Sequence, residues 1–239
     1  ARLLGAAYIP FGYGVDIALK FLKEAIKKGF SLILIDTIAP LGAKAFTHPD
    51  FDVVWREIEE ADIAVTLHVG ADSSWDPIPL SFYNNGGSVP EHTAGDAPRD
   101  ALAYMGIQYN AEIFLASMIF DGVFQRFPNL RVGVVELGAS WIISWMKQLD
   151  QSFRAFRRLQ DLSQLKLLPS EYVLKHIKLT AFPGEDIGWL LTNGAEDLMM
   201  FATDYPHHEG TDDPISRYER TMNNISEEVK SKFYTQNFK

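Results

Sequence analysis

Two short apolar segments of the chain each lead to a side chain that can bind a metal ion. Residues 63–67 (Ile-Ala-Val-Thr-Leu) are followed by His68, and the run that begins at residue 198 leads to Asp204. Short apolar runs are typical of strands that are buried on both faces. In parallel α/β folds, side chains at the carboxyl ends of such strands lie where ligands bind. An imidazole and a carboxylate at two strand ends are suitable ligands for a divalent metal such as zinc.

Each of these residues, taken alone, has a simpler explanation. A single histidine at a strand end is often a structural residue, and an aspartate before Tyr-Pro can serve as a turn or helix cap. Their occurrence together at two strand ends favours a site. Glu136 also closes an apolar strand-like segment, and His207 lies three residues after Asp204. The candidate metal ligands are therefore His68 and Asp204, and the candidate catalytic residues are Asp204, Glu136 and His207.

A repeated alternation of strand and helix must position these side chains. Six apolar segments are predicted as strands, at residues 2–9, 30–37, 63–68, 131–136, 176–181 and 198–200. Segments with helical spacing of apolar residues separate them, including residues 109–127 and 141–160, and such an order predicts parallel pairing through right-handed crossovers. No glycine-rich phosphate loop follows any strand, so nucleotide binding has no support. Because side chains that bind metals follow several strands, a closed barrel with one shared mouth is favoured over a doubly wound sheet.

The barrel interpretation has two consequences for the organisation of the chain. A (β/α)₈ barrel needs eight strands, so we expect about two strand units to precede Ala1 in a single domain that contains all of residues 1–239. Residues 70–108 are rich in proline and glycine and are predicted to form a long loop. A loop of that length directly after His68 is expected to act as a lid or to determine specificity.

Composition narrows the classes of function. The 239 residues carry a net charge of −9, which argues against a nucleic-acid partner. Cysteine is absent, so a metal must be held by histidine or carboxylate side chains. No apolar run is long enough to span a membrane and no signal peptide is visible, so we expect a cytoplasmic protein without a membrane partner. The expected partner is a small-molecule substrate, and the apolar helix at residues 109–127 makes a homodimer plausible.

Several segments resemble a known family. They are residues 66–70 (Thr-Leu-His-Val-Gly), 126–132 (Arg-Phe-Pro-Asn-Leu-Arg-Val), 136–141 (Glu-Leu-Gly-Ala-Ser-Trp), 182–186 (Phe-Pro-Gly-Glu-Asp) and 201–207 (Phe-Ala-Thr-Asp-Tyr-Pro-His). In this order they are similar to the amidohydrolase-related family that includes aminocarboxymuconate semialdehyde decarboxylase. The resemblance implies a (β/α)₈ barrel with one divalent metal, often zinc, in its mouth. Members are hydrolases, decarboxylases or hydratases that act on small, often carboxylated or aromatic substrates.

The resemblance also implies roles for individual residues. His68 matches the metal-binding histidine of the fifth strand, and Asp204 matches the aspartate of the last strand, which binds or adjoins the metal and moves the proton of its water. The implied function is a metal-dependent hydrolase in which metal-activated water attacks the substrate and Asp204 acts as proton shuttle. Non-oxidative decarboxylation at the same metal is the alternative, and a metal-free binding or scaffold protein is a second one.

Two features depart from the family pattern. The family's first strand carries a His-x-His pair, and no His-x-His occurs in these residues. Glu136 stands where many members place a catalytic histidine. Glu136 is therefore a substitute proton shuttle, an additional metal ligand, or a structural group that binds backbone amides at the start of the next helix.

Overall fold

Six parallel strands, hydrogen-bonded in their sequence order, form the single sheet in the described part of the chain. The computed structural model describes residues 3–37, 44–70, 78–88, 98, 100–207 and 210–238. An unreversed order distinguishes this sheet from a doubly wound one, whose strand order reverses at a switch point. It is the order of neighbouring strands in a (β/α)₈ barrel. The strands are β1 (Ala7–Ile9), β2 (Leu32–Ile35), β3 (Ala64–His68), β4 (Arg131–Val135), β5 (Ile177–Thr180) and β6 (Met199–Met200).

Side chains alternate between the two faces of each strand, and the faces differ in burial. One face packs under the helices and is almost fully buried, with Ile9, Ile33, Ile35, Val65, Leu67, Val132, Val134, Ile177, Leu179 and Met199. The opposite face, which we call the inner face, carries Tyr8, Leu34, Thr66, His68, Val135 and Thr180. Register joins these residues across strands, because Tyr8 pairs with Leu34 and Leu34 pairs with Thr66. The inner face is therefore continuous from β1 to β3 and beyond.

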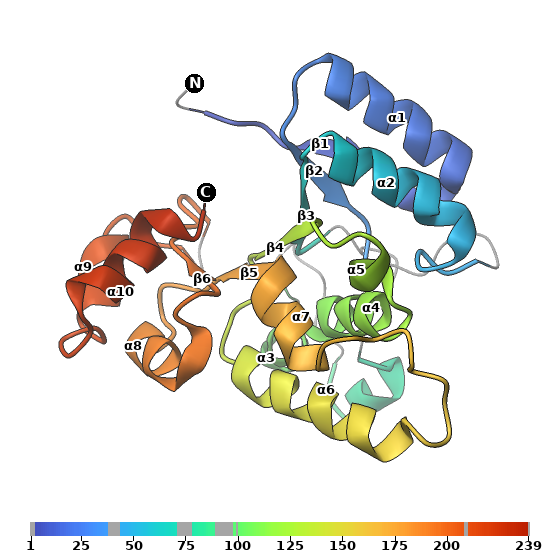
Figure 1. Ribbon diagram of the computed structural model, residues 1–239. Coiled ribbons are helices and arrows are strands. Elements are labelled where there is room, and N and C mark those ends of the chain that lie inside the picture. The colour runs from blue at the N-terminus through green and yellow to red at the C-terminus, as the bar shows by residue number, and fades with distance from the viewer. Residues whose placement is uncertain are drawn as a thin grey trace.

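Helices cover the buried face of the sheet. In Figure 1 the strand labels follow one another across the centre of the molecule, with α1 and α2 beside β1 and β2, and with α8 to α10 beside β6. None of the helices in the described residues is long and apolar enough to cross a membrane. The helices are α1 (Val15–Lys27), α2 (Asp52–Glu60), α3 (Ala101–Met105), α4 (Tyr109–Phe120), α5 (Val123–Arg126), α6 (Ile142–Phe156), α7 (Pro169–His176), α8 (Ile187–Leu190), α9 (Pro214–Glu219) and α10 (Glu227–Ser231). Short 3₁₀ or π turns lie at Phe11–Tyr13, Pro49–Phe51, Leu80–Tyr83, Leu191–Ala195 and Lys232–Gln236.

Three local predictions need correction. The helix predicted at residues 109–127 is two helices, because Gly122 adopts a left-handed φ of 72° between α4 and α5. The strand predicted from residue 176 begins at Ile177, and His176 ends α7, a helix that the sequence pattern did not predict. Residues 70–108 contain the turn at Leu80–Tyr83 and helix α3. Residues 71–77, 89–97 and 99 lie outside the described residues, so a lid there stays a prediction.

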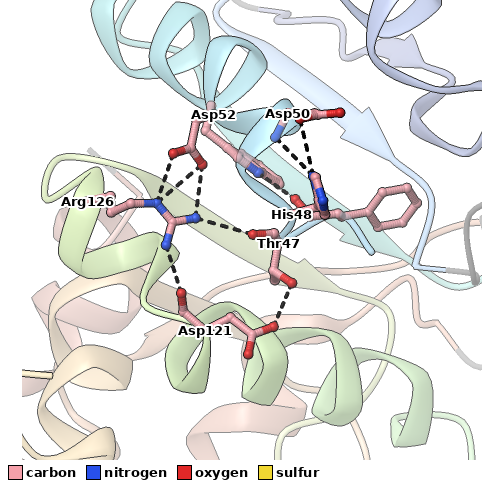
Figure 2. A network of polar contacts seen from close by, with 8 residues as sticks. Thr47, His48, Asp50, Asp52, Asp121 and Arg126 are labelled. Atoms are coloured by element: carbon pink, nitrogen blue, oxygen red, sulfur yellow. Dashed lines mark hydrogen bonds and ion pairs between the residues drawn. The ribbon is translucent and has the colours of Figure 1, made fainter. Parts of the chain in front are cut away.

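A polar network fastens the segment after β2 to the helices before β4 (Figure 2). Arg126 Nη2 lies 2.9 Å from Asp52 Oδ1, and Arg126 Nη1 donates to the backbone oxygen of Asp121 at 2.7 Å. Thr47 Oγ1 donates to Asp121 Oδ2 at 2.6 Å. The network joins the start of α2 to α4 and α5, and therefore fixes the helices that flank β3.

Candidate functional site

The candidate site lies at the carboxyl ends of β3, β4 and β6. His68 is the last residue of β3, Glu136 follows β4 directly, and Asp204 lies four residues beyond β6. Glu136 and Asp204 adopt left-handed φ values of 58° and 52°, a region that costs about 1 kcal/mol or more for a residue with a Cβ. Val135 already lies on the inner face, so regular alternation would place Glu136 among the helices. The left-handed turn instead directs its carboxylate to the inner face, where it meets His68.

Glu136 joins two imidazoles in a buried position. Its Oε2 lies 2.7 Å from His68 Nε2, and its Oε1 lies 3.1 Å from His207 Nδ1. Only 4% of the Glu136 side chain is exposed. Burial by itself raises the pKa of Glu136, but the hydrogen bonds from His68 and His207 outweigh burial and lower that pKa. Glu136 is therefore an anion at neutral pH, and it favours a positive charge on the groups around it.

The orientation of His68 is fixed by its own backbone neighbour. His68 Nδ1 lies 2.7 Å from the carbonyl oxygen of Val69. A carbonyl oxygen only accepts, so Nδ1 carries the proton and Nε2 points into the site. This arrangement is typical of metal-binding histidines, whose second nitrogen donates to a carbonyl or carboxylate. Nε2 also faces an oxygen of Glu136, at 2.7 Å.

Asp204 and His207 complete the cluster. His207 Nδ1 lies 3.5 Å from Asp204 Oδ1, and the backbone N–H of His207 donates to the carbonyl of Asp204 at 2.9 Å. One ligand atom from each of Glu136, Asp204 and His207 lies within 4.8 Å of the others, so these three residues could hold one metal ion. His68 adjoins the group through Glu136. Nitrogen and carboxylate ligands together suit a borderline or hard divalent ion such as zinc or manganese. All four residues selected from the sequence therefore lie together.

Close backbone packing holds the loop that carries Asp204. A Cβ on Gly210 would lie 2.2 Å from the carbonyl oxygen of Asp204, so only glycine allows this approach. The N–H of Thr211 donates to the carbonyl of Thr203 at 3.1 Å. From α9, the hydroxyl of Tyr218 donates to the carbonyls of Ala181 and Ala202, at 2.7 and 3.1 Å, and so joins the ends of β5 and β6.

Glu185 ties the loop that follows Glu136 to the loop that follows β5. Its carboxylate accepts the backbone N–H groups of Ala139, Ser140 and Phe182 at 2.7 to 3.0 Å. Ala139 and Ser140 precede α6, so a carboxylate there also offsets the positive end of that helix. Glu185 thus binds the backbone amides at the start of α6, which was one of the three roles considered for Glu136. Glu136 is left with its two imidazole contacts.

Sequence reasoning missed one carboxylate at the same edge of the sheet. Asp36 directly follows β2 and is 4% exposed. Its Oδ1 accepts from the hydroxyl of Tyr8 at 2.6 Å, and its Oδ2 accepts from the backbone N–H of Gly12 at 3.2 Å. The signal that identified His68 and Asp204 was present, because Asp36 closes an apolar run. Asp36 was overlooked because the predicted strand extended to residue 37, which placed Asp36 inside the strand and not at its end.

Comparison with known proteins bears on the fold and the family. The family model described as amidohydrolase matches residues 2–237. No curated protein matches the chain. Among solved structures, an amidohydrolase from Mycobacterium avium subsp. paratuberculosis is 20% identical with a TM-score of 0.78, and the match covers 98% of this chain and 56% of that one. The 5-carboxyvanillate decarboxylase from Sphingomonas paucimobilis is 23% identical with a TM-score of 0.66, covering 93% of this chain and 61% of that one.

A third similar structure contains a metal. The dihydroxybenzoic acid decarboxylase from Polaromonas sp. with bound manganese and the inhibitor 2-nitroresorcinol is 19% identical with a TM-score of 0.71, over 98% of this chain and 67% of that one. The chain thus spans 56% and 61% of the length of the first two structures. Identities of this size show the fold alone, and the expected α/β class with (β/α)₈ architecture is confirmed. The match of the family model over nearly every residue shows that the chain belongs to the amidohydrolase family.

Proposed function

We propose that this chain carries the metal-binding mouth of a non-oxidative decarboxylase that acts on a small aromatic or dienoic carboxylate. The observation that carries the proposal is the pair of imidazoles held by the buried anion of Glu136, at 2.7 and 3.1 Å. Similarity to two decarboxylase structures supports this reaction over the hydrolysis that the family resemblance first suggested.

His68 and Asp204 would hold the divalent metal, as the family resemblance implies, with Glu136 as a further ligand. In the structure, the atoms close enough to share one ion belong to Glu136, Asp204 and His207, and His68 adjoins them through Glu136. Imidazole and carboxylate ligands are compatible with either zinc or manganese, and the similar Polaromonas enzyme contains manganese. A divalent ion bound here would supply Lewis-acid polarisation of a ligand oxygen. The proton on His68 Nδ1, fixed by the Val69 carbonyl, keeps Nε2 directed at that position.

Decarboxylation requires a proton at the carbon atom that loses CO₂. His207 suits this role, because its side chain is 49% exposed and its Nδ1 contacts both Glu136 and Asp204. The proton moves from the imidazole to the ring carbon, the bond between that carbon and the carboxylate breaks, and its electron pair returns to the ring. CO₂ leaves, and solvent returns the proton to His207. Two neighbouring carboxylates stabilise the protonated imidazole before the transfer.

Hydrolysis is the second candidate function, and the position of Asp204 is compatible with it as well. Asp204 Oδ1 lies 3.5 Å from His207 Nδ1, and this carboxylate could accept a proton from attacking water and return it to the leaving group. The same side chains thus serve either reaction, and only the substrate distinguishes the two.

The test incubates the full-length protein, loaded with Mn²⁺ or with Zn²⁺, with 2,6-dihydroxybenzoate and with 4-nitrophenyl acetate. We expect release of CO₂ from the aryl carboxylate and little hydrolysis of the ester. His207→Asn should lower kcat for CO₂ release about 10²- to 10⁴-fold, with metal content measured in the same samples. His48→Asn, which alters a partly exposed histidine in another part of the chain, should have no effect. Ester hydrolysis without CO₂ release would replace the proposal with the hydrolase.

A further inference from the structure

Three side chains on successive strands lie on the inner face, with Tyr8 level with Leu34 and therefore one inward-facing position before Asp36. Tyr8 lies on β1, Asp36 follows β2, and His68 ends β3. Ile9 and Ile35, the neighbours of Tyr8 and Asp36 in sequence, are packed in the core under the helices. The side chains of Tyr8 and Asp36 therefore point the other way, to the inner face that also carries His68.

Strand register places Asp36 beside His68. Leu34 pairs with Thr66. Asp36 lies two residues after Leu34, and His68 lies two residues after Thr66. Continuing that register brings Asp36 level with His68 on the adjacent strand, and neighbouring parallel strands are about 4.8 Å apart. The two side chains thus start about one strand spacing from each other on the same face and at the same edge of the sheet.

The contacts of Asp36 indicate a positioning role and not a ligand role. Both of its carboxylate oxygens accept hydrogen bonds, one from Tyr8 Oη at 2.6 Å and one from the N–H of Gly12 at 3.2 Å. What Asp36 holds is the phenol of Tyr8.

Tyr8 has both an aromatic surface and an acceptor atom left for a ligand. Its side chain is 50% exposed at β1, the edge strand of the described sheet, although its hydroxyl is hydrogen-bonded. Burial of the phenol and its hydrogen bond to Asp36 raise the pKa of Tyr8, so the hydroxyl keeps its proton and donates it to the carboxylate. The phenol oxygen can still accept a hydrogen bond from another donor.

We propose that Tyr8, oriented by Asp36, is a specificity-determining residue in the wall of the mouth: its ring packs against a bound aryl carboxylate, and its oxygen accepts a hydrogen bond from a hydroxyl group on that ligand. The inference deepens the proposed decarboxylase function and rests on it for the class of ligand. Removing the oxygen should therefore affect only ligands that carry the donor.

The test measures binding of 2-hydroxybenzoate and of benzoate to the Mn²⁺-loaded full-length protein by calorimetry. Tyr8→Phe keeps the ring and removes the oxygen, and it should weaken 2-hydroxybenzoate binding about fivefold to tenfold while leaving benzoate binding unchanged. Asp36→Asn should weaken the same ligand, because the phenol is no longer held by a carboxylate. Tyr234→Phe is the matched control: Tyr234 Oη donates to Glu219 at 3.0 Å, in a phenol–carboxylate pair that joins the C-terminal turn to α9.

Equal effects of Tyr8→Phe on both ligands, no effect on either, or an effect matched by Tyr234→Phe would overturn the inference. Failure of the unaltered protein to bind 2-hydroxybenzoate would overturn it too. CO₂ release is followed in the same samples to separate the two proposals. If binding of 2-hydroxybenzoate depends on Tyr8 but no CO₂ is released, the decarboxylase proposal is refuted and the role of Tyr8 stands. If CO₂ is released but binding does not depend on Tyr8, the role of Tyr8 is refuted and the decarboxylase proposal stands.

Discussion

Substitution of Gly210 by alanine tests whether the loop around Asp204 is packed as described. The added Cβ would lie 2.2 Å from the carbonyl oxygen of Asp204, 2.5 Å from its carbonyl carbon and 2.8 Å from the carbonyl oxygen of Thr203. Ordinary contacts to a Cβ begin at 3.4 Å, and backbone atoms cannot rotate away as a flexible side chain can. The backbone of Asp204 must therefore move by roughly 1 Å, at a cost of about 1–3 kcal/mol.

The same shift should reach the site. A displacement of about 1 Å in a catalytic group can cost on the order of 100-fold in rate, so we expect Gly210→Ala to weaken Mn²⁺ binding and to lower turnover by at least tenfold. The assays are urea unfolding without metal, to obtain the free energy of unfolding, and calorimetric titration with Mn²⁺, to obtain the affinity of the folded protein.

Two other glycines provide matched controls. Gly184→Ala places its Cβ in open space and should change neither quantity. Gly188→Ala places its Cβ 1.8 Å from the carbonyl oxygen of Thr221, between α8 and the segment after α9, and should destabilise the fold without changing Mn²⁺ affinity. Normal stability and affinity in Gly210→Ala would refute the packing of this loop. A similar loss of affinity in Gly188→Ala would show that general instability, and not the position of Asp204, weakens metal binding.

The remaining predictions concern three glutamates. Glu136→Gln removes a buried anion that contacts two imidazoles, and should lower the free energy of unfolding in urea at pH 7 by about 2–4 kcal/mol; an unchanged value would contradict those contacts. Burial raises the pKa of Glu112 to about 7, above its unfolded value of 4.5, so its contribution to stability is complete below pH 4.5 and is lost as the pH rises through 7. Between pH 5 and pH 8, the free energy of unfolding should therefore fall by about 1–2 kcal/mol less in Glu112→Gln than in the unaltered protein, after allowance for partial exposure. Glu60→Gln, at an exposed site, is the control. The same pH dependence in both variants would argue against a raised pKa at Glu112. Glu185→Ala should lower unfolding stability by about 2–4 kcal/mol, more than the roughly 1 kcal/mol expected when Asp186, the cap of α8, is changed to alanine.

The sequence allowed the fold to be predicted, and it selected four candidate site residues that lie together in the structure, because both depend on local patterns. Short apolar runs mark parallel strands, and strand ends in such folds meet at one edge. His68 and Asp204 could therefore be assigned to one mouth although 136 positions separate them. Tertiary contacts decided the other features. Glu136 adopts a left-handed φ of 58°, a conformation that a glycine in the sequence would normally indicate. The reason for this conformation is the contact with His68, which the sequence does not show.

Two other misses have similar causes. Helix α7 is short and begins at a proline, and its end is held by His176, whose Nδ1 lies 2.7 Å from the carbonyl oxygen of Leu130. Neither the contact nor the stacking of His176 on Phe124 at 4.5 Å follows from residue spacing. The Tyr8–Asp36 pair joins residues 28 positions apart, and its importance depends on the register between β1 and β2.

The most direct test of the site is the stoichiometry and affinity of Mn²⁺ or Zn²⁺ binding by the full-length protein and three variants. We expect one equivalent of metal in the unaltered protein, and a loss of affinity of about 100-fold or more in both His68→Ala and Asp204→Asn. His48→Ala, which changes a partly exposed histidine at the start of the Pro49–Phe51 turn, should bind metal normally. Unchanged affinity and stoichiometry in His68→Ala and Asp204→Asn would contradict the assignment of a metal site to the ends of β3, β4 and β6.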